Sequence, residues 1–454
     1  MFLNAVQKIL PVLILLFVET LYAQQPALDS LVARVFAANP ELRVQGLIEL
    51  ERTLNEQLAR ASRQPTVDLK SDYLLSAGGR RIAFPVGDLF NPAYATLNQL
   101  TQSNSFPTDL ENVDEQFLPN NFHDTRFEVR YPLLAPQIER ETALRAAQTA
   151  EAREQTRVLE NQLRGQTRDL FYAVQQARAG QRIVDSARVV LTELLRVNRS
   201  LVRNDLRTSD VVSRTEAELA DLDARRADLV AQEAIATGAL NRLLHQPLNT
   251  PLTRPNETTI PPLPDPAALD DLLAAALTDR PEFAQLDAGD RALLALDALQ
   301  EAGGKPTLGA FLNAGAQGFL GGDLGEHPYA TVGVGFAWNL YDGKKRDLHR
   351  EITDVQRQQL AARRTAAEDG IGFEVWRAYQ TLTGERARLD ALGAGVRAAE
   401  ASLRILESKY RNQNALLVEY LDARNDLTTK QLEANLSRWR YWQNYGRLLT
   451  AVGR

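Results

Sequence analysis

Two long stretches of this 454-residue chain contain no proline, and this constrains the fold more than any other feature. Proline is absent from residues 137–246 and from every position after Pro328, and both stretches are rich in Ala, Leu, Arg, Glu and Gln, which favour helix. Each is interrupted once by turn-prone residues, RNDLRTSD at 203–210 and RNQN at 411–414. Because Asn and Asp tolerate left-handed backbone and cap helices, we expect two helical hairpins with these segments as their tips.

Helix lengths then constrain the architecture. Three pairs of helices are expected: 136–203 and 344–411 before the tips, 209–246 and 419–454 after them, and 27–61 and 268–302 nearer the start of each half. The helices before the tips would each extend roughly 100 Å at 1.5 Å per residue. A shorter helix leaving a tip, stacked end to end on one of the third pair, would match that length. The pattern predicts a cylinder of helices much longer than an ordinary domain.

An internal repeat accounts for this pairing. Residues 27–66 align without a gap on 268–307, with eleven of forty positions identical, and NPEL aligns with RPEF. The stretch 247–266 between the halves holds seven prolines, which is typical of a stiff extended linker. We therefore predict a first repeat over 24–246, a linker over 247–266 and a second repeat over 267–454.

The N-terminus is typical of an exported protein. Lys8 precedes the apolar run from Ile9 to Val18, and Ala23 is a small residue suited to cleavage. This indicates a secretory signal peptide over residues 1–23, since ten apolar residues are too few to span a bilayer. No later run reaches eighteen apolar residues, so no membrane-spanning helix is expected after it.

Composition and motifs argue against several classes of function. The chain has no cysteine, which excludes disulfides and cysteine zinc sites, and its formal net charge of -6 gives no reason to expect a nucleic-acid partner. Its four histidines are scattered without an H-E-x-x-H motif, and GFLGGDLGE lacks the G-K-[ST] of a phosphate loop. We expect no enzyme activity, no cofactor and no metal site.

Ahead of each long helix the hydrophobic period changes from 3.6 to 2, which indicates β-strands. Four segments show it: TVDLKSDY at 66–73, TRFEVRY at 125–131, LGAFLNAGAQ at 308–317 and ATVGVGFAWNL at 330–340. In the first two, charged residues occupy one face: Asp68, Lys70, Asp72, Arg126, Glu128 and Arg130. The other face is apolar and includes Val67, Leu69, Phe127, Val129, Val332, Val334 and Phe336. A half-buried soluble sheet produces the same alternation.

The membrane interpretation is favoured because no other amphipathic element remains to cover the apolar face. Strands of about 9–11 residues cross a bilayer when tilted, and open sheet edges are not tolerated in lipid. Four strands cannot close alone, whereas three chains give twelve, the even number that such barrels have. The charged face is then predicted to line the lumen and the apolar face to meet lipid. The long segment 76–122 is expected to fold as a surface loop outside the cell.

Together these features resemble the TolC-like outer-membrane efflux proteins over essentially the whole mature chain. The residues that carry the resemblance are NPEL and RPEF, WNLYDGKKR at 338–346, SDVVSRTEAEL at 209–219 and VEYLDAR at 418–424. The resemblance implies a homotrimer in the outer membrane, with a 12-stranded β-barrel continuous with an α-helical tunnel across the periplasm. It implies the exit duct of a tripartite efflux or type I secretion system, partnered by a periplasmic adaptor and an inner-membrane pump of RND or ABC type. A periplasmic coiled-coil scaffold without a pore is the alternative.

The resemblance also implies roles for individual residues near the tips. Glu419 and Asp422 fall where the family carries rings of acidic residues at the periplasmic entrance, although a solvated helix face would equally explain them. Tyr410 and Asp210 match the latch of the closed state, but Ala415 replaces the latch arginine, so we expect a weaker latch aided by Arg207 or Arg411.

Both tips are expected to dock the adaptor through Arg203, Asn204, Asp205, Asn412, Gln413 and Asn414. Asn204 and Gln413 stand where the family usually has glycine. Asn mimics the left-handed backbone of glycine, but Gln does so poorly, so the sequence leaves the geometry of the tips and the choice of adaptor open.

Overall fold

The computed structural model describes residues 25–118, 120–252, 262–319 and 327–454. The predicted signal peptide lies outside these residues. The chain divides into two compact units: a helical unit, which contains the residues up to Thr53 together with 146–293 and 354–454, and a strand-bearing unit, which contains 54–145 and 294–353. Each unit is described by itself below.

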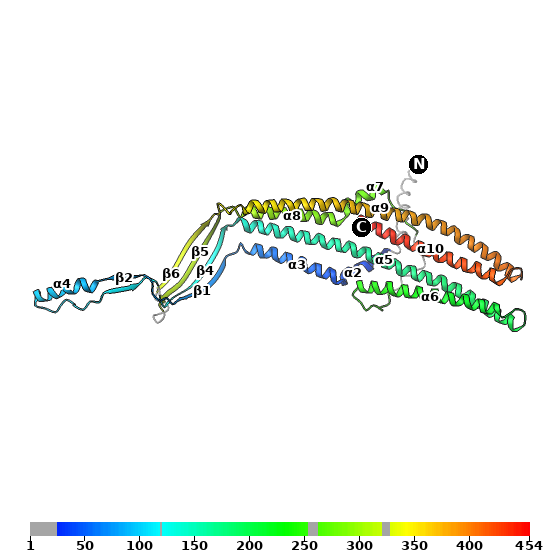
Figure 1. The fold of residues 1–454 in the computed structure, drawn as a ribbon, viewed down its shortest axis with the longest axis horizontal. Helices are drawn as coiled ribbons and strands as arrows, with labels where there is room; N and C mark the ends of the chain where they lie inside the picture. Colours follow the sequence, from blue (N-terminus) through cyan, green and yellow to red (C-terminus); the bar gives the residue numbers. More distant parts are fainter. Residues whose placement is uncertain (1–24, 119, 253–261, 320–326) are drawn as a thin grey trace, which may run out of the picture. The chain divides into compact units, whose positions relative to one another are not determined.

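The helices follow the proline-free stretches closely. Their bounds are α2 (Gln25–Ala38), α3 (Pro40–Ala61), α5 (Pro136–Arg203), α6 (Asp210–Leu243), α7 (Leu269–Asp279), α8 (Pro281–Ala302), α9 (Lys345–Arg411) and α10 (Leu417–Val452). The long helices predicted at 136–203 and 344–411 are confirmed to within one residue. The predicted tips join α5 to α6 and α9 to α10, and each pair forms a hairpin (Figure 1). In the described part of the chain, no helix is both long enough and apolar enough to cross a membrane.

One expectation about the helices is wrong. The segments 27–61 and 268–302 are not continuous, because each is broken immediately before a proline, at Pro40 and at Pro281. A proline ring disfavours helical backbone in the residue before it and supplies no N–H; accordingly Arg280 is extended, with φ -71° and ψ 123°. The resulting helices α3 and α8 both have 22 residues and begin 241 residues apart (281 − 40).

Three groups of buried apolar side chains hold the helical unit together. The first includes Val35 of α2, Leu163 of α5 and Leu240 of α6. The second joins α7, α9 and α10 through residues such as Leu272, Val375, Leu382 and Leu448. The third lies nearest the tips and draws on both hairpins, with Val184, Leu222, Leu403 and Leu421 among its members. The ends of the two hairpins therefore share one apolar core.

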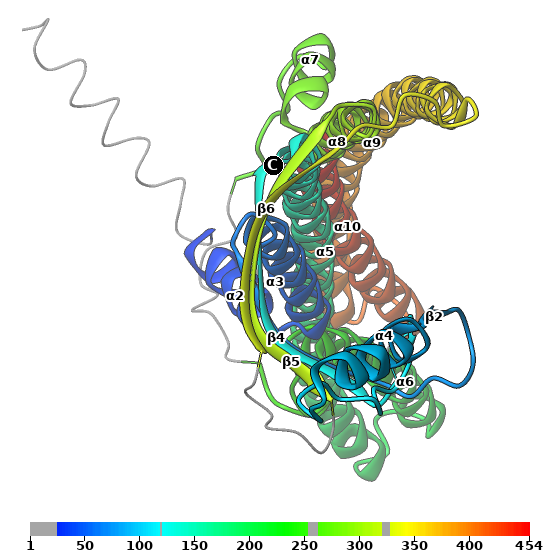
Figure 2. The same ribbon diagram turned by 90° about the vertical axis from the view of Figure 1, so that its left-hand side faces the viewer.

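The strand-bearing unit is built on a four-stranded antiparallel sheet of order β1-β4-β5-β6. Its strands are β1 (Thr66–Leu74), β4 (Phe122–Leu134), β5 (Thr307–Phe319) and β6 (His327–Ala337). The sheet is curved, with one concave and one convex side (Figure 2). All four strands were predicted, but β6 ends before Trp338, whose indole N–H donates instead to the carbonyl of Gly304 at 3.0 Å.

The segment between β1 and β4 folds into a small module of its own. It contains β2 (Arg81–Phe84), α4 (Val86–Thr101) and β3 (Val113–Gln116), with β2 and β3 paired antiparallel. The expectation of a folded loop is confirmed, whereas its position outside the cell stays a prediction.

Candidate functional site

The strand register gathers the predicted charged residues on one face of the sheet. Asp68 pairs with Glu128, Lys70 with Arg126, and Asp72 with Asp124 across β1 and β4. Because side chains alternate along a strand, these residues share a face with Arg130 and with every second residue of β5 and β6. The alternation predicted from the sequence is therefore confirmed as two distinct faces. That the charged face lines a lumen stays a prediction.

Ion pairs run across this charged face. Lys70 Nζ lies 3.0 Å from Glu128 Oε2, and Arg126 lies 3.0 Å from Asp72. Arg126 also pairs with Asp124, and Arg130 pairs with Glu128. The sequence alternation identified five of these six ion-paired residues but missed Asp124, which lies one position before the segment predicted as a strand. With Asp68 included, three cations face four carboxylates, so the face is polar and close to neutral.

Two glycines give the large side chains of this face the room they occupy. A Cβ at Gly333 would lie 2.3 Å from the Phe311 ring, and a Cβ at Gly315 would lie 2.6 Å from Arg126 Cβ. Gly333 and Gly315 are the cross-strand partners of Phe311 and Arg126. The absence of a side chain at Gly333 therefore lets the Phe311 ring lie against β6, and the absence of one at Gly315 lets the Arg126 side chain lie against β5.

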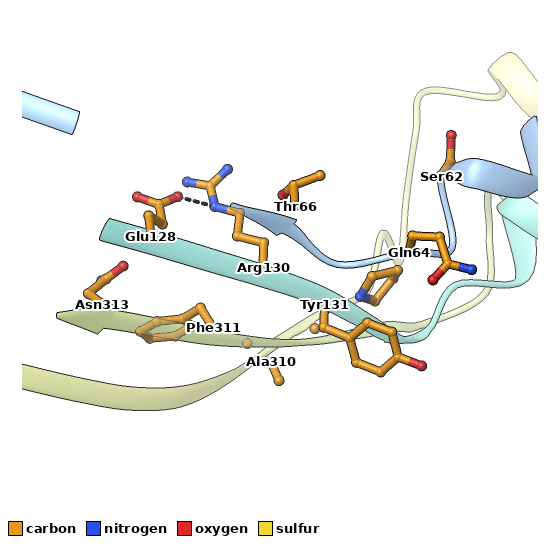
Figure 3. Close-up of a pocket in the computed structure, with 12 residues that line it drawn as sticks. Ser62, Gln64, Thr66, Glu128, Arg130, Tyr131, Ala310, Phe311 and Asn313 are labelled. Atoms are coloured by element: carbon orange, nitrogen blue, oxygen red, sulfur yellow. Dashed lines mark ion pairs between the residues drawn. The ribbon is translucent and has the colours of Figure 1, made fainter. Parts of the chain in front are cut away.

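A hollow of about 610 Å³ lies near the start of β1. Its lining includes Glu128, Arg130, Phe311 and Asn313. Glu128 and Arg130 extend to one side of β4 while Tyr131 extends to the other, and the ion pair of the first two is marked in Figure 3. Tyr131 and Ala310 also line the hollow, so it draws on residues of both faces of the sheet.

The opposite face presents apolar side chains to the surroundings of the chain. Val67, Leu69, Phe127, Val334 and Phe336 are exposed, and Val332 is 77% exposed; Val129 is half-buried. A contiguous exposed apolar surface of this kind marks a contact with membrane or protein. Contact with lipid stays a prediction for these residues.

Both hairpin tips have the same backbone geometry. Asp205 and Gln413 have left-handed backbone, with φ of 57° and 62°. The N–H of Leu206 donates to Leu201 at 2.9 Å, and that of Asn414 donates to Lys409 at 2.8 Å, the bonds that define a Schellman helix end. The glycine-like position of the first tip is therefore Asp205 and not Asn204, whose side chain donates to the Ser200 carbonyl at 2.8 Å. At the second tip Gln413 adopts the left-handed conformation that a glycine would adopt.

The predicted latch tyrosine is held by a residue that the sequence did not single out. Tyr410 Oη donates to Asn198 Oδ1 at 3.2 Å, and the fully buried Asn198 donates to Thr215 Oγ1 at 3.1 Å. The Tyr410 ring stacks on Tyr420 with 5.3 Å between ring centroids, and the Arg207 guanidinium lies 5.7 Å from the Tyr410 ring centroid. A part for Arg207 in the latch stays a prediction. Burial raises the pKa of Tyr410 above its usual value.

The other predicted latch residues make local contacts in this chain. Asp210 accepts a hydrogen bond from Thr208, and Arg411 pairs with Glu407 on its own helix. A part for Asp210 in the latch stays a prediction. Asn198 was missed, although a signal was present: it falls at helical spacing between Leu194 and Val202, on the apolar stripe of α5, where a polar side chain needs a partner.

The acidic pair has two different surroundings. Glu419 Oε2 accepts the backbone N–H of Leu416 at 2.8 Å and so caps the start of α10. Asp422 is exposed and lies close enough to α6 to affect Glu218. The pKa of Glu218 is raised, first by burial and then by the negative charges of Asp221 and Asp422, with the Arg225 charge opposing. Glu218 therefore lies near Asp422, whereas Asp221 pairs with Arg225 of its own helix at 3.1 Å.

A groove of about 1000 Å³ lies between the hairpins near their tips. Its lining includes Val189, Leu206, Arg207, Tyr410 and Gln413. The six predicted docking residues of the tips are all exposed. Within the described residues, no three His, Asp or Glu side chains come together in a way that could hold a metal ion.

Comparison with known proteins relates these features to one family. Residues 272–454 match the family described as Outer membrane efflux protein. No curated protein gives a match to the sequence. The outer-membrane channel OprN has a TM-score of 0.70 to this chain at 17% identity, over 95% of this chain and 92% of the other.

Two further solved structures show the same likeness. For the CmeC outer membrane channel of Campylobacter jejuni the TM-score is 0.70 at 12% identity, over 94% of this chain and 85% of the other. For the outer membrane protein VceC of Vibrio cholerae it is 0.68 at 16% identity, over 95% and 98%. The chain thus resembles the TolC-like outer-membrane efflux proteins in sequence over its second half and in fold over nearly all its length.

Proposed function

We propose that this chain, which carries the outer membrane efflux protein signature in its second half and the fold of outer-membrane channel subunits throughout, is one subunit of a passive exit channel in the outer membrane. The observation that carries the proposal is the sheet, with an ion-paired face on one side and an exposed apolar face on the other. A membrane-spanning barrel needs that arrangement, with water inside and lipid outside.

The edges of the sheet support assembly from several copies. Among the strands that the structure describes, β1 pairs only with β4 and β6 only with β5, so each outer strand has one edge without a partner strand there. Open edges are not tolerated in lipid, and a barrel removes them. β1 of one copy then pairs with β6 of the next, and three copies give a homotrimer with twelve strands. The charged face lines the lumen, and the apolar face meets outer-membrane lipid.

The helices supply the periplasmic part of the duct. The two hairpins, α5–α6 and α9–α10, form the wall of a tunnel. Their exposed tips, with the groove between them, dock a periplasmic adaptor that connects the channel to an inner-membrane pump. Glu419 and Asp422, together with Glu218 and Asp221, form the acidic entrance.

The mass of the detergent-extracted particle tests the proposal. We expect light scattering, corrected for detergent, to give three chains per particle, and the trimer to persist on electrophoresis without boiling. A monodisperse monomer from extracted membranes would overturn the proposal and favour a periplasmic scaffold without a pore.

A further inference from the structure

Two helices, α3 and α9, each carry a stripe of apolar side chains that are all more than half exposed. The α3 stripe is defined as Val44, Leu47, Leu50, Leu54 and Leu58, and the α9 stripe as Leu348, Ile352 and Val355. Successive members are three or four residues apart, which places each stripe along one side of its helix. At 1.5 Å per residue the stripes cover about 21 Å of α3 and about 10 Å of α9.

The α3 stripe points away from the helix that α3 packs against. The buried Gln45 donates from its side chain to the carbonyl of Ala152 in α5 at 3.4 Å. Glu49 accepts a hydrogen bond from Thr156 of α5, and Ala59 is buried as well. With about 100° between successive residues, Gln45, Glu49 and Ala59 share one side of α3, and the stripe occupies the opposite side.

The α9 stripe likewise points away from α8. Arg357 Nε lies 2.8 Å from Asp290 Oδ1, and Arg350 Nε lies 3.6 Å from Asp297 Oδ1. Thr353, between the two arginines in sequence, is buried. Because the arginines are about two helical turns apart, they mark the side of α9 that packs on α8. The stripe lies on the other side of the helix.

These two helices continue the two outer strands of the sheet. α3 is followed by β1, and α9 follows β6, with only a short segment between helix and strand in each case. Both connections leave from the same end of the antiparallel sheet, as the pairs along it show: Thr66 with Arg130, Leu134 with Leu308 and Thr307 with Ala337. Each outer strand, with one edge that lacks a partner strand among those described, is therefore extended by a helix whose stripe is turned away from its own neighbour in the chain.

We propose that the α3 stripe of one copy packs against the α9 stripe of the next copy. This inference rests on the proposed trimer, in which β1 of one copy pairs with β6 of the next. α3 runs toward the sheet and α9 runs away from it, so the two helices form an antiparallel pair that continues the strand junction.

A second copy of the chain fits both stripes with a single operation. One rotation brings β1 to β6 and α3 to α9 together, and repetition of this head-to-tail contact closes a ring. Both stripes are then withdrawn from water in every copy. An unrelated partner protein would have to match two separate surfaces on two different helices.

Paired cysteines test this helix pair, because the natural chain has none. Leu54→Cys and Ile352→Cys place one thiol on each stripe. The matched control carries Arg52→Cys and Asp354→Cys, which lie two residues away on the same helices and are turned by about 200° from the stripe positions. All four positions are exposed in the chain, so none of the changes removes a core contact.

Detergent-extracted trimers of both double variants and of the two single stripe variants are treated with a bifunctional maleimide whose spacer spans about two helical turns. Separation under denaturing conditions then shows which chains are covalently linked. We expect Leu54→Cys with Ile352→Cys to give linked dimers and trimers of the chain. The control pair and the single variants should give almost none, because the contact joins two different stripes.

Absence of links in the double stripe variant would overturn the helix pair, and so would equal linking of the control pair. Links in a single stripe variant would show that like stripes meet, which also overturns it. The particle mass of the untreated sample separates these outcomes from failure of the trimer. A trimer without links leaves the proposed channel standing, whereas a monomer removes both proposals.

Discussion

Tyr410 of α9 donates its hydroxyl proton to Asn198 of α5, and this 3.2 Å bond joins the two hairpins close to their tips. Asn198 is fully buried and itself donates a hydrogen bond to Thr215 of α6. Movement of one tip away from the other must therefore break a bond inside the apolar core that both hairpins share.

Tyr410→Phe removes the hydrogen bond to Asn198 and leaves the size of the side chain almost unchanged. The buried Asn198 oxygen is left without its donor, which costs about 1–3 kcal/mol, so we expect separated tips and a higher open probability in planar bilayers. Asp210→Asn is the comparison, since Asp210 bonds to Thr208 in this chain. A larger rise in open probability for Asp210→Asn than for Tyr410→Phe would assign the latch to Asp210 instead.

Gln413→Gly should stabilise the second tip. Gln413 has φ 62°, a left-handed conformation that costs a residue with a Cβ about 1 kcal/mol relative to glycine. We expect thermal unfolding of the trimer to shift upward for Gln413→Gly and to change little for Gln413→Ala, which keeps the Cβ. An unchanged midpoint for the glycine variant would show that the tip carries no such strain.

Gly333→Ala should destabilise the sheet, whereas Gly335→Ala two residues along the same strand should not. The added Cβ lies 2.3 Å from the Phe311 ring at 333, but 4.0 Å from its nearest neighbour at 335. Overpacking of this kind costs about 1–3 kcal/mol of stability. Adding Phe311→Ala to the Gly333→Ala chain removes the clashing ring and should recover the lost stability. Midpoints of thermal unfolding measure all three variants, and equal values for the two glycine positions would contradict the packing described.

Glu419→Gln combined with Asp422→Asn should remove block of the channel by multivalent cations. In the proposed trimer the pair would supply six carboxylates around a threefold axis, and these would recruit cations by direct attraction. The amide oxygen introduced by Glu419→Gln can still accept the Leu416 N–H, so the cap of α10 is kept. Reversal potentials and blocked current in planar bilayers give the readout. If selectivity and block persist in the double variant, the pair is a solvated helix face.

The sequence predicted the regular parts of this fold because their signals are local. Absence of proline located α5 and α9 to within one residue, and the change of period located all four strands of the main sheet. The helix breaks before Pro40 and Pro281 were not predicted. The sequence on both sides of each proline favours helix, and a single proline can also occur in the first turn of a helix or at a kink. Strand alternation alone was enough to separate Asp68 and Lys70 from Val67 and Leu69.

What the sequence did not yield depends on segments that are distant along the chain. Asn198 became a candidate only when α9 brought Tyr410 against it, 212 residues away. Asp422 was identified by its position, but its proximity to Glu218 is set by the packing of α10 on α6. Asn204 and Asp205 are equally turn-prone, and only the hydrogen bonds of the tip decide which of them takes the left-handed backbone.

The most direct test of a water-filled lumen lined by the charged face uses two adjacent residues of β6. Thr331 pairs with Asn313 on the charged face, and Val332 pairs with Leu312 on the apolar face. Each is replaced singly by cysteine in the cysteine-free chain, and single-channel current is recorded while a charged, water-soluble thiol reagent is added. We expect the current through Thr331→Cys trimers to fall as the thiol is modified and the current through Val332→Cys trimers to stay constant. The opposite pattern, or no channel current from either trimer, would contradict the proposed pore.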